Sequence, residues 1–548
     1  MPARSLSRSL FLPLLSLAAC LGGCPATTRP GHQMPDTLGD RRVLRLSTPM
    51  ASHYGERRPV SSDGIEARVL SALGDAARSA GRVVPVTDLS ARRAATEICR
   101  VLPPSGPPPS RVVEFALRSQ GIIDPPPHMV IANLPDGLDD EVLVQLGSRF
   151  REIMAHKDFS RVGIGVVQPE GSRLSRVLVA LLEHRIDLVP IPRRLARDQR
   201  VGLRFRSAPS HHNLHLVLTP PDGKIVSTRP VQACREAADC GSAAALSCGL
   251  RGVYQVEITG EGQFGPEVLA NFPVFCDQDP PSQVRYGATR PLKGDVELLE
   301  RALFQGTNRV RTKAGLSALA LDPRLTAVAR RHSKDMRDSR FVGHVSPSTG
   351  RPVDRLRAAK VLHLVLRENV AQAYSVQEAL RELLNSPAHR ENILSRDVTV
   401  MGVGVVLDRR ASTPVMLLTQ LFMKPGKAYD PRTARAEVLG AIRRSRARVG
   451  LPPLAVDEAL SQLAGEHVKV LLSGGGTVRS RADATLGAAL QRMGDRFGRI
   501  DGLHVRLSVI DALEQAEEIQ RKRYAHLGIG VGRSGEQIVI FLLLAGGR

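Results

Sequence analysis

An internal repeat constrains the fold of this 548-residue chain more than any other feature of its sequence. Residues 315–325 (GLSALALDPRL) align without gaps with residues 450–460 (GLPPLAVDEAL), and each string follows an amphipathic helix pattern, at 297–311 and 434–449. Self-similarity of this kind indicates that two segments share one fold. We therefore expect two related α/β units in the C-terminal half of the chain.

A second signal extends the repeat toward the N-terminus. The pattern glycine, apolar residue, glycine begins a strand-like run in both units, as GVGVV at 402–406 and GIGV at 528–531, and it recurs as GIGVV at 163–167. Helix-like stretches at 65–80 and 91–100 precede this further copy. The sequence thus predicts three related α/β units, at residues 60–195, 295–425 and 432–548.

The pattern changes between the first two units. Short alternating apolar runs at 214–218, 252–258 and 272–275 are bounded by Gly, Pro and Asp. This is typical of antiparallel strands, and we expect a small all-β sandwich at residues 200–280. Residues 280–294, which are rich in Pro and Gly, are expected to be a linker.

Cysteine usage points to an oxidising compartment. Four of the seven cysteines crowd into the predicted β-sandwich, where they allow two disulfides in three possible pairings: Cys234, Cys240, Cys248 and Cys276. A zinc site is the alternative, but no pair is spaced C-x₂-C. Cys99 lies in a helix-like apolar context and is expected to be a buried core thiol.

The N-terminus resembles a bacterial lipoprotein signal. Two arginines precede an apolar run at 10–17, and the string LAAC ends at Cys20. LGGC, ending at Cys24, is a second match. We expect a signal peptide at 1–19, acylation of Cys20 or else Cys24, and a tether over 20–59. The alternative is a plain secretory signal. No later run approaches the ~20 apolar residues of a membrane-spanning helix.

The charge balance restricts the partners. The formal net charge is +22, which favours anionic surfaces such as lipid headgroups, acidic polysaccharide or nucleic acid, or else solubilises several domains. Nucleic acid is not expected, because an exported chain with 3% aromatic residues lacks a stacking platform. The string GEGQFG at 260–265 satisfies G-x-G-x-x-G, but Pro266 follows it and a hairpin loop is the better interpretation.

The middle unit holds the concentrated set of chemical motifs. In chain order, these are FVGH at 341–344, DR at 354–355, RENVA at 367–371, SPAHRENIL at 386–394, GVGV at 402–405 and QLF at 420–422. Together they resemble the bacterial branch of the CAP superfamily (cysteine-rich secretory, antigen 5 and pathogenesis-related proteins) along residues 297–422. The resemblance implies an α+β fold, a three-layer α-β-α sandwich with a central antiparallel sheet. The first and third units would then be degenerate copies.

The resemblance also implies a cavity lined by two His and usually two Glu, which bind a divalent metal in some members. The matching residues are His344, Glu368 and His389, and we expect three further residues at the same cavity: Arg355, Asn369 and Asn392. Two imidazoles and a carboxylate suit zinc or another divalent metal and leave one coordination position open. The alternative is a hydrogen-bonded polar cluster that orders the fold.

This sequence departs from the family pattern at two positions. Ser386 falls where the second cavity Glu is usual, with Glu378 as a distant substitute, and Arg367 replaces the Gly that usually precedes Glu-Asn. Locally, Ser386 is expected to cap a helix that begins at Pro387. Glu368 is expected at the start of a strand or in a loop.

Three functions follow, in decreasing order of support. The first is a lipid-anchored binding or scaffold protein of the cell envelope that engages polysaccharide, lipid or another protein. The second is a metal-dependent, peptidase-like hydrolase with Glu368 as ligand or base. The third, nucleic-acid binding, has only the charge in its favour. His332 is given a structural role because it recurs as His467 in the copy that lacks the other cavity residues.

Overall fold

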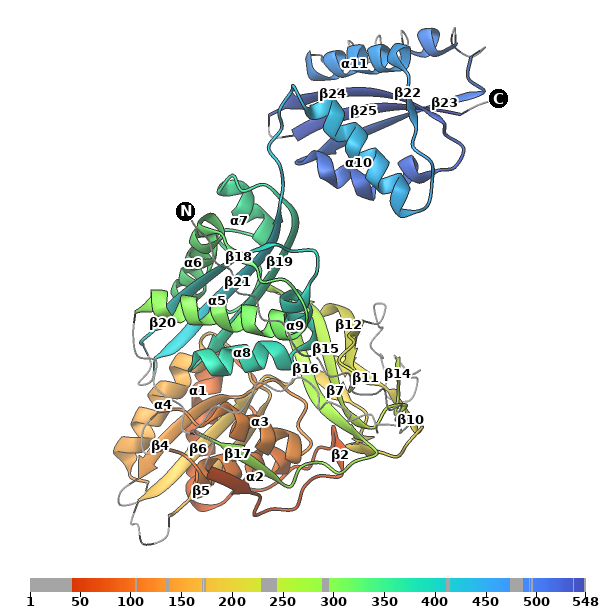
Figure 1. Cartoon of the computed structure of the whole chain (residues 1–548). Helices are drawn as coiled ribbons and strands as arrows, with labels where there is room; N and C mark the ends of the chain where they lie inside the picture. The colour runs from red at the N-terminus through yellow and green to blue at the C-terminus, as the bar shows by residue number, and fades with distance from the viewer. Residues whose placement is uncertain are drawn as a thin grey trace, which may run out of the picture.

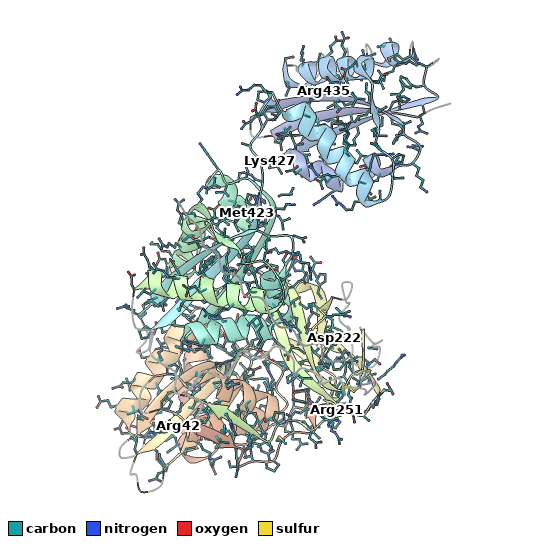
Figure 2. All side chains as sticks on the ribbon, viewed as in Figure 1. Arg42, Asp222, Arg251, Met423, Lys427 and Arg435 are labelled. Carbon is teal, nitrogen blue, oxygen red and sulfur yellow. A yellow bond between two sulfur atoms is a disulfide. The ribbon has the colours of Figure 1, made fainter. Side chains whose placement is uncertain are left out.

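The computed structural model describes residues 42–546 except 104–105, 135–137, 170, 172–173, 228–243, 288–294, 411–413, 474–485, 492, 494–495 and 536. Figure 1 shows the first two α/β units and a β-rich part in contact, with the third unit joined to them by one connection. That connection runs past Met423 and Lys427 to Arg435 (Figure 2). None of the described helices is long and apolar enough to cross a membrane.

The middle unit is a three-layer α-β-α sandwich. Its elements are α5 (Val296–Lys313), β18 (Ala320–Leu321), α6 (Pro323–Asp338), α7 (Pro352–Ala358), β19 (His363–Ala373), α8 (Val376–Asn385), α9 (Pro387–Leu394), β20 (Val400–Asp408) and β21 (Val415–Pro425). The sheet order is β18-β20-β21-β19. Apolar side chains of α5, α8 and α9 pack on one face, and those of α6 and α7 on the other. This confirms the predicted α+β class, although the sheet is not wholly antiparallel because β18 runs parallel to β20.

Two glycines let α6 lie directly against β20. A Cβ atom built on Gly402 would come within 3.0 Å of the backbone of Leu325, and one on Gly404 within 3.0 Å of the backbone of Ala329. Only glycine tolerates so close a helix-to-strand approach. The Gly-apolar-Gly string therefore marks the strand that a helix covers.

The first unit has the same sheet order, β3-β5-β6-β4. Its elements are α1 (Gly64–Ser79), β3 (Val86–Thr87), α2 (Leu89–Arg100), α3 (Ser110–Ser119), β4 (His128–Leu134), α4 (Asp140–Met154), β5 (Arg161–Val167) and β6 (Ser175–Leu182). Gly163 and Gly165 of β5 meet the backbone of α2 as Gly402 and Gly404 meet α6. Cys99 of α2 is buried and unpaired, as predicted.

The third unit repeats the order as β22-β24-β25-β23. Its elements are α10 (Ala434–Arg448), β22 (Ala455–Val456), α11 (Glu458–Ser473), β23 (Arg499–Leu507), η1 (Ile510–Gln515), η2 (Glu517–Gln520), β24 (His526–Ser534) and β25 (Gln537–Gly546). Gly528 and Gly530 of β24 meet the backbone of α11 at Leu460 and Ala464. Three sheets of one chain thus share both strand order and glycine contact.

The β-rich part contains a five-stranded sheet in the order β13-β12-β15-β16-β9. Counting also the short strands outside this sheet, the strands of the β-rich part are β7 (Ile186–Leu188), β8 (Ile191–Pro192), β9 (Arg194–Leu195), β10 (Arg200–Leu203), β11 (Phe205–Ser207), β12 (His212–Thr219), β13 (Val226–Ser227), β14 (Ala244–Ser247), β15 (Gly252–Gly262) and β16 (Gly265–Cys276). The sheet is mixed rather than antiparallel, because β9 pairs parallel with β16. β15 and β16 form a long hairpin that closes at Gly262 and Gly265, so the G-x-G-x-x-G string is a hairpin loop, as predicted.

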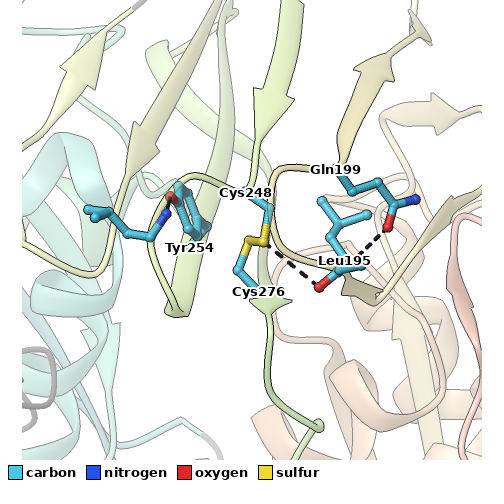
Figure 3. Close-up of a disulfide and its surroundings, with 7 residues drawn as sticks. Leu195, Gln199, Cys248, Tyr254 and Cys276 are labelled. Carbon is cyan, nitrogen blue, oxygen red and sulfur yellow. Dashed lines mark hydrogen bonds between the residues drawn. A yellow bond between two sulfur atoms is a disulfide. The ribbon is translucent and has the colours of Figure 1, made fainter.

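One disulfide joins this part together. Cys248 pairs with Cys276 at the end of β16, with Cα atoms 5.5 Å apart, and the Cys248 sulfur lies 3.8 Å from the carbonyl of Leu195 (Figure 3). Beside it, the hydroxyl of Tyr254 accepts a hydrogen bond from the backbone of Leu250. Cys234 and Cys240 lie outside the described residues, as do Cys20 and Cys24.

The expected tether and linker are partly folded. β1 (Arg42–Arg45) pairs antiparallel with β17 (Gln283–Tyr286), and β2 (His53–Tyr54) pairs with β8. Tyr54 is fully buried against Phe272, at 4.8 Å between ring centroids. The tether prediction for 20–59 is therefore wrong for residues 42–59. The polar composition of this segment does not make it flexible, because single apolar side chains such as Leu44 are buried and anchor it.

Candidate functional site

Glu368 and Asn369 lie in the middle of β19, not at its start as expected. They pair with Leu421 and Gln420 of β21. Because successive side chains of a strand point to opposite faces, the two residues serve opposite layers. Asn369 reaches α9, where its amide donates to the carbonyl of His389 at 3.2 Å. Glu368 faces the segment that carries His344 and Arg355.

The Glu368 carboxylate has a partner at each oxygen. His344 Nδ1 lies 2.9 Å from one oxygen, and Arg355 donates to the other at 2.6 Å. The side chains of Glu368 and Arg355 are only 2% and 4% exposed. Burial alone would raise the pKa of Glu368, but the hydrogen bond from His344 and the charges of His344 and Arg355 outweigh it and leave the pKa below its usual value. The carboxyl is therefore ionised and committed to an internal pair.

Arg355 also orders the loop that presents His344. Its Nη2 atom bonds Glu368, and its Nη1 atom donates to the carbonyls of His344, at 2.9 Å, and Gly350, at 2.8 Å. One α7 side chain thereby joins the loop at both ends to β19. A planar guanidinium is suited to such a fork of acceptors.

His389 enters from the first turn of α9. Ser386 caps this helix by accepting a hydrogen bond from the backbone of His389, and Pro387 takes the first position, as predicted. Burial, helped by the nearby charge of His344, lowers the pKa of His389 to about 3, so its imidazole is neutral. Asn392, one turn along, donates to the Glu368 carbonyl at 3.0 Å and to the Asn369 side chain at 2.9 Å.

His332 and Arg367 border the cluster. His332 is 1% exposed, and its Nε2 lies 2.9 Å from the carbonyl of Gly343, so it ties α6 to the 341–344 segment. On the far side of Arg355, a cavity of about 430 Å³ opens between α6, the 348–350 loop and α7. Arg367 is partly exposed and lies 3.7 Å from both Glu391 and Asp397, which places its charge at the rim of the polar cluster.

All six predicted site residues thus belong to one hydrogen-bonded network that crosses β19, and Glu368 serves in it as an internal partner. Each oxygen of Glu368 accepts a hydrogen bond, one from His344 and one from Arg355, so the guanidinium already balances the charge of this carboxylate. Among the described residues, no group of three His, Cys, Asp or Glu side chains is placed to hold a metal. The geometry supports the polar-cluster alternative over the predicted ligand set of His344, His389 and Glu368.

Sequence reasoning missed two residues of the cluster, which come from the β15–β16 hairpin. The carbonyl of Phe264 accepts hydrogen bonds from the backbone of both His344 and Val345, each at 2.8 Å. Glu257 is fully buried and accepts from the backbone of Ala388 at 2.9 Å. Burial raises its pKa to about 7, against the lowering effect of hydrogen bonds from Ser386 and Ala388. A charged residue within the apolar run 252–258 was the available signal, since it shows that this face of the strand does not meet the sheet's own core.

Residues 304–422 match the model of the cysteine-rich secretory protein (CAP) family. The uncharacterized protein YkwD of Bacillus subtilis is 32% identical over 155 residues, or 28% of this chain and 60% of that protein. The uncharacterized membrane protein YlbC of the same organism is 37% identical over 115 residues, or 21% of this chain and 33% of that protein. The similarity therefore leaves a substantial part of both relatives, and most of this chain, unmatched.

Among solved structures, an extracellular protein containing an SCP domain from Bacillus anthracis aligns at 29% identity. The alignment covers 31% of this chain and 59% of that protein, with a TM-score of 0.22.

Proposed function

The chain is a bacterial member of the CAP superfamily through residues 304–422, and we propose that it is an exported binding or scaffold protein of the cell envelope. Its CAP domain would be the central module. The units at 60–195 and 432–548, which share its sheet order, would be degenerate copies kept for packing or for partners. The 200–280 part would connect the first two units.

The state of Glu368 carries this proposal. A general base or a metal ligand must be reached by its substrate or ion, but the Glu368 side chain is only 2% exposed and both of its oxygens already accept charge-assisted bonds from the same domain. Removing Arg355 from Glu368 would leave two buried charges unpaired. A cluster of this kind orders a binding surface and is not poised for proton transfer.

Export and anchoring belong to the same proposal. The apolar run at 10–17 followed by LAAC supports a lipoprotein signal with Cys20, or Cys24, as the acylated residue. The Cys248–Cys276 disulfide supports an oxidising compartment. With a net charge of +22, the partners we propose are the membrane reached through the anchor, anionic polysaccharide or lipid, and envelope proteins.

The second candidate is a metal-dependent, peptidase-like hydrolase. It is favoured by one observation, that His344, Glu368 and the start of α9 gather in one cluster. Zinc or another divalent metal would be held by the free imidazole nitrogens of His344 and His389, while Glu368 would keep its bond to His344 Nδ1.

Zinc titration calorimetry on the full chain distinguishes the two candidates. The comparison protein carries His344→Ala and His389→Ala. A binding protein gives no difference between the two titrations. One-to-one binding at micromolar or tighter affinity that is lost in the double variant would overturn the proposal in favour of the hydrolase.

A further inference from the structure

The β15–β16 hairpin covers the CAP cluster from outside the CAP domain. Its turn lies over the segment that carries His344, and its first strand lies against the start of α9. The hairpin therefore contacts both chain segments that supply the cluster's histidines, although it is separated from them by the linker at 280–294.

At the turn, the contact has the form of peptide recognition. Two adjacent backbone N–H groups, of His344 and Val345, converge on the carbonyl of Phe264. The ring of Phe264 packs against Phe341 with centroids 5.0 Å apart, and it joins a small apolar cluster that includes Met336 and Val370. Gly343 permits this approach, because a Cβ on it would lie 2.5 Å from the Cβ of Phe264.

At the other end, the contact is with a carboxylate. Glu257 accepts from the backbone of Ala388 and from the hydroxyl of Ser386, the first-turn N–H and cap of α9. Asn271, on the neighbouring strand, donates to the carbonyl of Asn385 at 3.2 Å. The CAP face thus offers donors spaced to receive both a backbone carbonyl and an acidic side chain.

The Glu257 end of this contact is not built for greatest stability. Glu257 is 0% exposed, and among the described residues no Lys or Arg forms an ion pair with it. A buried carboxyl without a cation stabilises a contact less than an apolar side chain of the same volume. This end of the contact therefore opens at lower cost than a packed apolar end would.

We propose that this face of the CAP domain, formed by Phe341, Gly343, the N–H groups of His344 and Val345, and the start of α9, is a polypeptide-binding surface. The hairpin is its internal occupant, and the competing ligand is a polypeptide loop that presents an aromatic residue and a carboxylate. This inference rests on the proposed binding function and names the chemical class of its partner.

The first test asks whether the hairpin closes the site. In the full chain, Phe264→Ala and Glu257→Gln are combined, and hydrogen exchange is followed at the backbone N–H groups of His344 and Val345, which donate directly to the hairpin. Exchange at these two amides tracks the population of the open form, so we expect their rate to rise by about fivefold or more. Gln263→Ala, at the exposed tip of the same turn, is the matched control and leaves the rate unchanged. An unchanged rate in the double variant overturns the proposal.

The second test asks what the opened face binds. The probe is a fluorescein-labelled peptide of residues 255–273, cyclised through added terminal cysteines. Anisotropy should show binding to the double variant, weaker or no binding to the parent chain whose face is filled, and no binding of a peptide that carries Phe264→Ala. Faster exchange at the His344 and Val345 amides without peptide binding would reduce the hairpin to a packing contact and overturn the inference. The zinc titration is independent of this result, so the two proposals can fail separately.

Discussion

Glu368 lies in the middle of β19 with its carboxylate between a guanidinium and an imidazole. Its geometry explains why a residue that the sequence marks as a metal ligand serves another purpose here. The buried Arg355 takes one oxygen and orders the His344 loop with its remaining donors. The charge of Glu368 is thus needed by the fold before any ligand arrives.

Replacing Glu368 by Ala should therefore destabilise the CAP domain strongly. Arg355 would be left as an unpaired buried charge, which typically costs about 3–5 kcal/mol. Hydrogen exchange of the β19 and β21 amides measures the loss locally, without assuming that the whole chain unfolds as one unit. Glu458→Ala, which removes an exposed partner of Arg435, is the control and should change protection little. Equal protection in Glu368→Ala and the parent chain would refute the buried-pair interpretation.

The sequence predicted the part of the candidate site that the CAP domain itself supplies, but not the part that comes from the β15–β16 hairpin. The motifs around His344, Glu368 and His389 gave their grouping, and Ser386-Pro387 gave the start of α9. The pairing of Glu368 with Arg355 could not be read from the sequence, because it depends on where α7 lies over β19. Glu257 could not be assigned either, since its contact is with another domain and strand alternation alone does not tell what covers the outer face.

At the scale of elements, the helix-covered strand is what the three α/β units share. The glycines of β5, β20 and β24 meet the backbones of α2, α6 and α11 in the same way. The Gly-apolar-Gly string was recognisable in the sequence because this close approach excludes every side chain. The short strands β3, β18 and β22 were not predicted, since two residues carry no periodicity.

A methyl group on the covered strand should push the helix away. Gly404→Ala places a Cβ within 3.0 Å of the α6 backbone, and overpacking of this kind costs about 1–3 kcal/mol. Gly465→Ala is the matched control, because that helical position of α11 has nothing within 4 Å and Ala favours helix by about 0.5–1 kcal/mol. Thermal unfolding should move in opposite directions in the two variants. Similar melting of both would mean that α6 is free to shift.

α8 contacts α3 where Arg381 donates to the Ser110 hydroxyl and Asn385 donates to the Glu114 carboxylate, and this contact should depend on pH. Burial raises the pKa of Glu378 to about 7, and burial together with the charges of Glu378 and Glu114 raises the pKa of Glu382 well above its usual value. Carboxyls whose pKa is raised by folding contribute their full stability below the unfolded value of about 4.3, and this contribution is lost as pH rises toward about 7. Amide protection in α8 should accordingly be higher at pH 5 than at pH 8.

Glu382→Gln removes much of that dependence, since the amide is neutral throughout this range. Its α8 protection at pH 8 should exceed that of the parent chain. Glu141→Gln, at an exposed position of α4, provides the control and should leave the pH profile as it was. A profile in Glu382→Gln that matches the parent would show that the three carboxyls do not interact.

At the scale of the whole molecule, the chain combines a basic composition with the membrane-attachment signal proposed for residues 1–20. Its net charge of +22 is uneven, because residues 60–195 are close to neutral, so the attraction to an anionic surface comes from the rest of the chain. Such attraction is screened within about 8 Å at physiological salt and does not hold a protein in place. Stable residence at the envelope, as proposed above, would then require the proposed lipid anchor.

Cys20→Ser should accordingly release the protein from the membrane fraction. Acyl chains contribute about 0.8 kcal/mol for each buried CH₂, and electrostatic attraction alone is reversible and weakened by salt. In a bacterial host fed an alkynyl fatty acid, the parent chain should take up label and sediment with membranes, and Cys20→Ser should do neither. Cys24→Ser is the control that keeps the first lipobox intact. Label that persists in Cys20→Ser but disappears in Cys24→Ser would move the anchor to the second cysteine, and label unaffected by both changes would contradict lipid anchoring at this end of the chain.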